Sequence, residues 1–242
     1  MQVIIEKNYQ DMSKKAAELV ASQIIFKPAS VLGFATGSTP LGMYEELIYL
    51  YQKGEVNFSE IISFNLDEYF KISPDDKNSY HYYMMNNFFN KINIQKSNIH
   101  LLNGMTDDVE KECSKYDKAI EKNGGIDLQI LGIGPNGHIG FNEPEKKLHA
   151  RTHLVKLSQE TIEANSRFFS DKTKVPDKAI SVGMATILKA EKIILLASGK
   201  NKAEAVKNTV NGFVDTMIPA SFLQTHPCIT MIIDEEAAIL LD

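Results

Sequence analysis

The chain has 242 residues, of which 43% are hydrophobic and 24% are charged. This is the composition of a folded globular protein with a substantial core, and it excludes long disordered or low-complexity regions. The 26 lysines and arginines are outnumbered by 31 aspartates and glutamates and form no dense basic cluster, so no nucleic-acid partner is expected.

The chain start and the cysteines indicate where the protein works. The apolar run near the N-terminus is too short for a signal peptide, and no segment approaches the roughly 20 apolar residues of a membrane span. Cys113 and Cys228 lie far apart and belong to no C-x-x-C pair. We therefore expect a cytoplasmic protein with reduced cysteines and no membrane partner.

Six short apolar segments predict strands buried on both faces, because the apolar residues are continuous and do not alternate. They span residues 3–5, 31–35, 61–66, 128–133, 192–197 and 229–233. Patterns typical of helices lie between them, at 11–25, 41–51, 80–89, 107–121 and 202–211. This alternation predicts one α/β domain over 1–242, with a mainly parallel sheet and helices on both faces. The more polar stretch from 149 to 181 is expected to be a loosely packed cover, or lid.

Ligands of such sheets bind at the carboxyl ends of the strands, so the loops there are of interest. The loop after the second strand is Thr36-Gly37-Ser38-Thr39, followed by Pro40 and a helix. We expect Ser38 or Thr39 to cap this helix, with Pro40 in its first position. The free amides would suit a phosphate, although no Walker sequence is present. A plain helix cap is the alternative.

The loops after the third and fifth strands carry charged residues. Asp67 and Glu68 follow the third strand, and either is a candidate general base, since an unperturbed aspartate is ionised at neutral pH. Lys202 falls in a first helical turn, where the helix dipole disfavours a cation that serves no anion. Solvated or capping side chains are the alternative for each.

The loop after the fourth strand, GIGPNGHIGFNEP, matches the G-x-G-x-x-G pattern of dinucleotide-binding turns. Such a turn requires a helix after its third glycine, Gly137, but the next residues are poor helix formers and end in Pro144. NAD binding is therefore not expected. The glycines instead permit close backbone approach, while Asn136, His138 and Glu143 offer polar and acid–base groups.

A surface histidine beside a solvated glutamate is the alternative for that loop. None of the other histidines has metal-ligand spacing with His138, so no metal site is expected.

Five segments that together extend over nearly the whole chain carry a family resemblance. They are GFATGSTPLGMYEEL, SFNLDEYF, LGIGPNGHIGFNEP, ANSRFF and HPCITMIID. These motifs resemble those of the glucosamine-6-phosphate deaminases, which isomerise an aldose to a ketose and release ammonia. The resemblance implies a Rossmann-like three-layer sandwich that binds a sugar phosphate without nucleotide, metal or redox cofactor, with the segment at roughly 149–181 as a lid.

The resemblance also implies roles for individual residues. Asp67 would be the base that moves a proton between C2 and C1 of the opened sugar. His138 would assist ring opening, with Asn136 and Glu143 holding and polarising its imidazole. The residues implied for binding the substrate or its phosphate are Thr36, Gly37, Ser38, Thr39, Gly137, Arg167 and Lys202.

Two other functions are weighed against this one. The 6-phosphogluconolactonases share the fold and a glycine–histidine loop, but they usually continue with a Ser-Leu-Phe-Pro type sequence where this chain has Ile139 to Pro144. Sugar-phosphate sensor domains lose the catalytic groups, whereas Asp67, His138 and Glu143 are all present here.

The quaternary structure is also considered. Hexameric, activated relatives have a longer C-terminal tail and more basic residues after the E-P motif. We therefore favour a monomer over a homo-oligomer and expect no activation by N-acetylglucosamine 6-phosphate.

Overall fold

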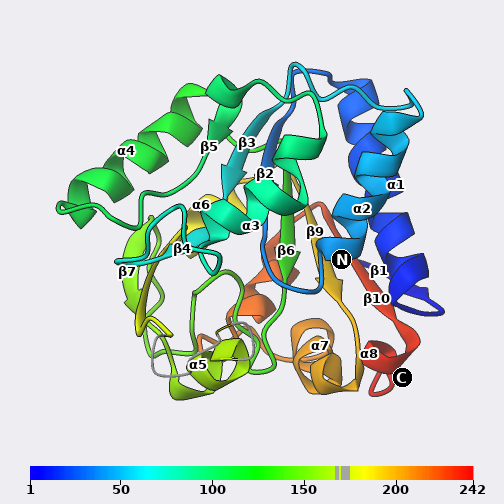
Figure 1. Ribbon diagram of the computed structural model, residues 1–242. Coiled ribbons are helices and arrows are strands. Elements are labelled where there is room, and N and C mark those ends of the chain that lie inside the picture. Colours follow the sequence, from blue (N-terminus) through cyan, green and yellow to red (C-terminus); the bar gives the residue numbers. More distant parts are fainter. Residues whose placement is uncertain (167–168, 170–174, 242) are drawn as a thin grey trace.

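The computed structural model describes residues 1–166, 169 and 175–241 (Figure 1). A seven-stranded sheet lies at its centre in the order β1-β10-β9-β6-β2-β3-β5, and every neighbouring pair is parallel. Its strands are β1 (Gln2–Glu6), β2 (Val31–Phe34), β3 (Ile62–Asn65), β5 (Ile99–His100), β6 (Leu128–Gly132), β9 (Lys192–Ala197) and β10 (Ile229–Asp234). The predicted α/β class with a parallel sheet is confirmed.

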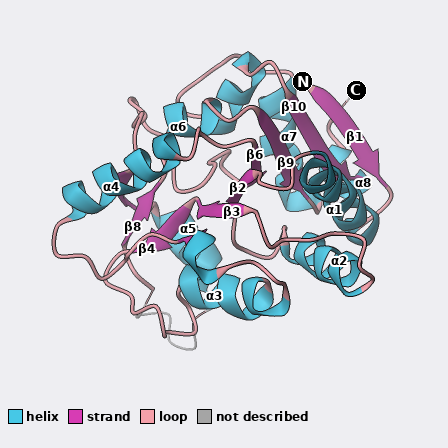
Figure 2. Ribbon diagram, turned by 90° about the horizontal axis from the view of Figure 1, so that it is seen from above, coloured by secondary structure: helices cyan, strands magenta, loops and turns pink. Residues whose placement is uncertain are grey.

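Helices cover both faces of this sheet (Figure 2). On one face α1 (Tyr9–Phe26), α2 (Leu41–Gln52) and α3 (Tyr80–Asn87) enclose a core that contains Leu32 and Phe34. The other core contains Val31 and Ala35. Adjacent strand residues point to opposite faces, which is why β2 supplies both cores. The helices in the second core are α4 (Val109–Lys122), α6 (Met184–Leu188), α7 (Ala203–Val210) and α8 (Glu235–Ala238).

Most of the predicted elements are confirmed to within a few residues, and two features of the sheet differ from expectation. Strand β1 was expected to be buried on both faces, but it lies at the edge of the sheet and the side chain of Ile5 is 52% exposed. Strand β5 was not predicted, because two residues carry no periodic signal.

The expectation of a loosely packed cover between 149 and 181 is wrong for part of that stretch. It contains β7 (His153–Lys156), α5 (Gln159–Asn165) and β8 (Lys178–Ser181). Strand β8 lies between β7 and β4 (Asp67–Tyr69) in a second, antiparallel sheet, and three of its four residues are fully buried. Pairing with a distant strand gives this segment its structure, and a local polarity pattern does not reveal such a partner.

The helix cap predicted for α2 is also wrong. Pro40 occupies the N-cap position, and its side chain forms no capping hydrogen bond. The hydroxyl of Tyr9, from α1, accepts a hydrogen bond from the amide of Gly42 at 2.8 Å and donates one to the carbonyl of Ser38 at 2.9 Å. A side chain 33 positions away therefore supplies the hydrogen-bond acceptor for an amide at the start of the helix.

The strand order reverses between β2 and β6. From β2 the chain adds β3 and β5 towards one edge, whereas from β6 it adds β9 and β10 towards the other. The loops that follow β2 and β6 diverge at this switch point and leave a crevice, where open α/β sheets bind their ligands. No helix among the described residues is long and apolar enough to cross a membrane.

Replacing Phe88 with alanine should lower the free energy of unfolding by about 3–5 kcal/mol. Phe88 is fully buried and its ring lies 4.8 Å from that of Tyr44 and 5.5 Å from that of Phe34. The matched control is Phe26→Ala, at a side chain that is 85% exposed, with an expected change within about 0.5 kcal/mol. Urea denaturation measures both, and equal losses would contradict this account of the core.

Candidate active site

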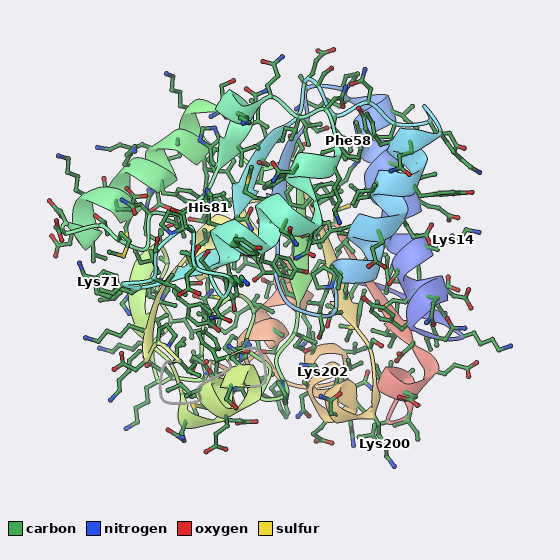
Figure 3. The ribbon with its side chains drawn as sticks, in the orientation of Figure 1. Lys14, Phe58, Lys71, His81, Lys200 and Lys202 are labelled. Atoms are coloured by element: carbon green, nitrogen blue, oxygen red, sulfur yellow. The ribbon has the colours of Figure 1, made fainter. Side chains whose placement is uncertain are left out.

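A cavity of about 580 Å³ opens at the switch point, between the loops that follow β2 and β6. The predicted site residues that line it are Thr36, Gly37, Ser38, Thr39, Asp67, Asn136, His138 and Lys202. Residues from four separate segments of the sequence thus meet in one place. In Figure 3, Lys202 lies near the start of α7, whereas Lys200 lies at the outer margin of the molecule.

Two predicted site residues that the structure describes do not line this cavity. Glu143 contacts the lining residue His138, and Gly137 shapes the loop that carries it. Arg167 falls outside the described residues.

Asp67 is the buried acid of the cavity wall. It begins β4, lies opposite Ser181 in the antiparallel ladder and is only 7% exposed. Burial, together with the neighbouring charge of Glu68, raises the pKa of Asp67 to about 8. The residue therefore holds a proton over much of the neutral range, unlike the ionised carboxylate expected for an unperturbed aspartate.

Glu68, the other candidate base, has a structural position. Its carboxylate accepts hydrogen bonds from the amides of Tyr69 at 2.8 Å, Tyr80 at 2.9 Å and His81 at 2.8 Å. These bonds fix the start of α3, which holds Tyr80 in the cavity wall. Burial raises the pKa of Glu68 to about 7, although its three amide partners oppose the shift. Since Glu68 is absent from the cavity lining, the geometry favours Asp67 as the acid that meets a ligand.

The glycines of the loop after β6 are required by close contacts. A Cβ atom on Gly134 would lie 2.2 Å from Cε1 of His138, so the imidazole packs directly on the backbone of Gly134. Gly137 has a φ of +84°, and a Cβ there would approach Ile218 to 2.9 Å. No helix starts between 138 and 144, as predicted, and the G-x-G-x-x-G pattern here shapes a histidine loop.

His138, Glu143 and Asn136 form a connected group. Nδ1 of His138 lies 3.7 Å from Oε2 of Glu143, and Nδ2 of Asn136 donates to the same oxygen at 3.0 Å. Burial lowers the pKa of His138, the charge of Glu143 opposes this, and Lys202 lowers it further. The imidazole is therefore neutral at neutral pH, and with Nδ1 facing Glu143 its Nε2 remains for a ligand.

Asp234 anchors the loop that carries Lys202. Its carboxylate accepts hydrogen bonds from the hydroxyl of Ser198 at 2.5 Å, the amide of Gly199 at 3.0 Å and the amide of Ala237 at 2.8 Å. Ser198 and Lys202 both line the cavity. Asp234 was not predicted, and its only signal in the sequence is its place directly after the apolar run of β10.

Other wall residues were also missed by sequence reasoning. Tyr80, Thr161 and Asn165 line the cavity, but α3 and α5 reach it only through tertiary packing. Ser198 and Asn201 lie in a loop that was predicted, although neither was selected. No group of three or more His, Cys, Asp or Glu side chains suited to a metal ion occurs in the described part of the chain.

The chain belongs to the glucosamine-6-phosphate isomerase/6-phosphogluconolactonase family, whose model matches residues 5–231. It is 64% identical over 241 residues to a glucosamine-6-phosphate deaminase of Halothermothrix orenii, covering 100% of both chains. It is 60% identical to that of Thermoanaerobacter pseudethanolicus, covering 100% of this chain and 95% of the relative.

Solved structures agree with this membership. A structure described as a monomeric glucosamine-6-phosphate deaminase has a TM-score of 0.97 and 46% identity, covering 99% of this chain and 100% of its own. A 6-phosphogluconolactonase from Thermotoga maritima has a TM-score of 0.76 and 20% identity, covering 97% and 99%. The second likeness shows a shared fold only.

The protonated Asp67 gives a testable dependence of stability on pH. Its folded pKa of about 8 lies above the unfolded value of about 3.9. The stability contributed by the bound proton is complete below the unfolded pKa and is lost as the pH rises through the folded pKa. Asp67→Asn keeps the site neutral, so its melting temperature should rise relative to wild type between pH 5 and pH 8 and then level off.

Differential scanning calorimetry over pH 5–9 measures this difference. The control is Asp107→Asn, at a fully exposed carboxylate, for which no comparable rise is expected. A constant difference between Asp67→Asn and wild type across the range would contradict the assigned pKa shift.

Proposed function

We propose that this protein is a glucosamine-6-phosphate deaminase, which converts D-glucosamine 6-phosphate and water into D-fructose 6-phosphate and ammonia. The main observation in support is that Asp67 and His138 line one cavity. They are the acid and the imidazole that such a reaction needs. Identity of 64% over the full length to a glucosamine-6-phosphate deaminase supports the same function. The reaction belongs to the catabolism of amino sugars such as N-acetylglucosamine.

The reaction begins with opening of the pyranose ring. The neutral imidazole of His138 takes the proton of the C1 hydroxyl and returns one to the ring oxygen, and Glu143 and Asn136 hold the imidazole in place. The aldehyde that forms at C1 makes the C2 proton acidic. Because burial lowers the pKa of His138, the neutral form that begins this step is the one present at neutral pH.

Asp67 then carries out the isomerisation. In its ionised form, the Asp67 carboxylate removes the proton from C2 and delivers it to C1, while a proton passes from the C2 nitrogen to the C1 oxygen. This leaves an imine at C2 and a hydroxyl at C1. Water adds to the imine, ammonia leaves and a ketone remains. A pKa of about 8 makes Asp67 a stronger base than an exposed aspartate and brings its proton affinity close to the working pH.

The 6-phosphate is the handle that positions the sugar. We assign its binding to the loop from Thr36 to Thr39, to Gly137 as part of the neighbouring turn, and to Lys202, with Arg167 as a further ligand outside the described residues. The energy of binding a dianion at one end holds C1 and C2 near the reacting groups. A net charge of −5 does not prevent this, because the field at the cavity is local.

We also propose a single-domain monomer in the cytoplasm, in which the part of 149–181 around helix α5 acts as a lid, whereas β8 is fixed in the second sheet. Helix α5 supports the lid, since its Thr161 and Asn165 form part of the cavity wall. The relative described as monomeric supports the oligomeric state. The cytoplasm follows from the substrate, because a doubly charged sugar phosphate does not cross a bilayer unaided.

Two variants test the assignment of the acid and the imidazole. Asp67→Asn should lower kcat by about 10²–10⁴-fold, because it removes the base. His138→Gln should lower turnover of the closed-ring substrate by about 10²-fold or more, because ring opening becomes limiting. Ammonia release from glucosamine 6-phosphate measures both. Lys14→Gln, at an exposed lysine on α1, is the control and should match wild type (Figure 3). Equal rates for Asp67→Asn and wild type would remove Asp67 from the mechanism.

N-Acetylglucosamine 6-phosphate should not activate the protein. Substrate saturation curves should be hyperbolic, and kcat/KM should stay within about twofold of its unliganded value when this compound is added below inhibitory concentrations. The measurement is initial-rate kinetics at several fixed concentrations of the compound. A sigmoidal curve that becomes hyperbolic on its addition would contradict the prediction.

A further inference from the structure

The carboxylate of Glu143 has an additional partner from the second half of the chain. The hydroxyl of Ser158, at the start of α5, lies 3.2 Å from Oε2 of Glu143. A carboxylate only accepts hydrogen bonds, so Ser158 is the donor in this contact. The same Glu143 oxygen accepts from Asn136 and faces the imidazole of His138. Ser158 therefore donates to the Glu143 oxygen that lies 3.7 Å from Nδ1 of His138.

Few groups balance the charge of Glu143. The residue is 5% exposed, and its other oxygen, Oε1, has no hydrogen-bond partner within the described residues. Hydrogen bonds from Asn136 at 3.0 Å and Ser158 at 3.2 Å are thus the two that its carboxylate receives there. In a buried site each donor to a charged group contributes strongly, and removing one is costly.

The other contacts of Ser158 leave its proton available for Glu143. Ser158 is the N-cap residue of α5, and its Oγ accepts a hydrogen bond from the amide of Thr161 at 3.1 Å. The hydroxyl oxygens of Ser158 and Thr161 lie 3.0 Å apart, and Thr161 is 3% exposed and lines the cavity. Either hydroxyl can donate in this contact, but the Glu143 carboxylate can only accept, so both contacts are made together when Thr161 donates to Ser158 and Ser158 donates to Glu143. The contacts are consistent with a chain of donors from Thr161 to Ser158 to Glu143.

We propose that Ser158 is a positioning residue for the reaction: its hydroxyl fixes the Glu143 carboxylate that holds His138, and so couples helix α5 to the acid–base group. This inference rests on the proposed deaminase function for its kinetic consequence. The structural part, a hydroxyl from α5 that sets the electrostatics of the His138–Glu143 pair, stands independently of the substrate.

The charged groups around His138 set the direction of the expected change. Glu143 faces Nδ1, Lys202 acts on the imidazole from the loop before α7, and Asp67 lies on the same cavity wall. Loss of the Ser158 donor leaves the Glu143 carboxylate less stabilised, so the His138–Glu143 pair should bind a proton more tightly. The apparent pKa of the pair should therefore rise.

The decisive variant is Ser158→Gly. Glycine is nearly as good an N-cap as serine, so this change removes the donor while it largely preserves the start of α5. We expect kcat for glucosamine 6-phosphate to fall about tenfold, with KM changed less than about twofold. Ser158→Thr keeps the hydroxyl and should restore most of kcat. Asp108→Gly removes the N-cap of α4, outside the cavity lining, and should leave kcat unchanged.

The second readout is the titration of the His138 imidazole by NMR in the absence of substrate, with His138→Gln identifying the resonance. An upward shift in Ser158→Gly and a return in Ser158→Thr support the proposal. If Ser158→Gly keeps both the kcat and the His138 titration of the wild type, the proposal is overturned. It is also overturned if kcat falls while the His138 titration does not move, because Ser158 would then act only as the cap of α5. If the wild type releases no ammonia, the proposed function fails, while the titration still decides the role of Ser158.

Discussion

The site depends on the hydrogen bonds that form where the chain leaves the parallel sheet after β3 and places Asp67 in the second sheet. Strand β3 ends at Asn65, and two residues later the chain pairs with β8 in the second sheet, where Asp67 lies opposite Ser181. The hydroxyl of Ser181 accepts a hydrogen bond from the amide of Phe141 at 3.0 Å, and the side chain of Asn142 donates one to the carbonyl of Val182 at 2.9 Å. The same short segment therefore holds the strand of the acid and the loop of the imidazole.

Burial in this region shifts the proton affinities of the two groups to which we assign the reaction. Removing a carboxylate from water disfavours its charged form, so the pKa of Asp67 rises to about 8. Removing an imidazole from water also disfavours its charged form, so the pKa of His138 falls. One physical cause thus moves the two groups in opposite directions: Asp67 becomes a stronger base, and His138 stays neutral and ready to accept a proton.

The two ends of the cavity are built differently. At the end assigned to proton transfer, partly buried side chains support one another, with Asn136 and Ser158 both donating to Glu143. At the end assigned to the phosphate, hydrogen bonds fix the backbone loops after β2 and β9. Tyr9 makes these bonds to the first loop and Asp234 makes them to the second. Fixed loops suit a group that must be bound firmly, whereas a tuned pair of side chains suits proton transfer.

The sequence alone determined the parallel α/β architecture, because short continuous apolar strands and amphipathic helices are local patterns. It also placed Asp67, His138 and Lys202 beyond the carboxyl ends of strands, since a strand followed by polar residues is visible without a structure, but it did not show that Asp67 begins β4. It did not reveal the second sheet, the support of the loops after β2 and β9 by Tyr9 and Asp234, or the donor at Ser158.

Those features join residues far apart in the chain, such as Tyr9 with Gly42 and Ser158 with Glu143. The choice between Asp67 and Glu68 was likewise decided by tertiary structure, because adjacent residues of a strand point to opposite sides and only packing shows which side is the cavity. The shifted pKa of Asp67 has the same origin, since burial is a property of the folded chain.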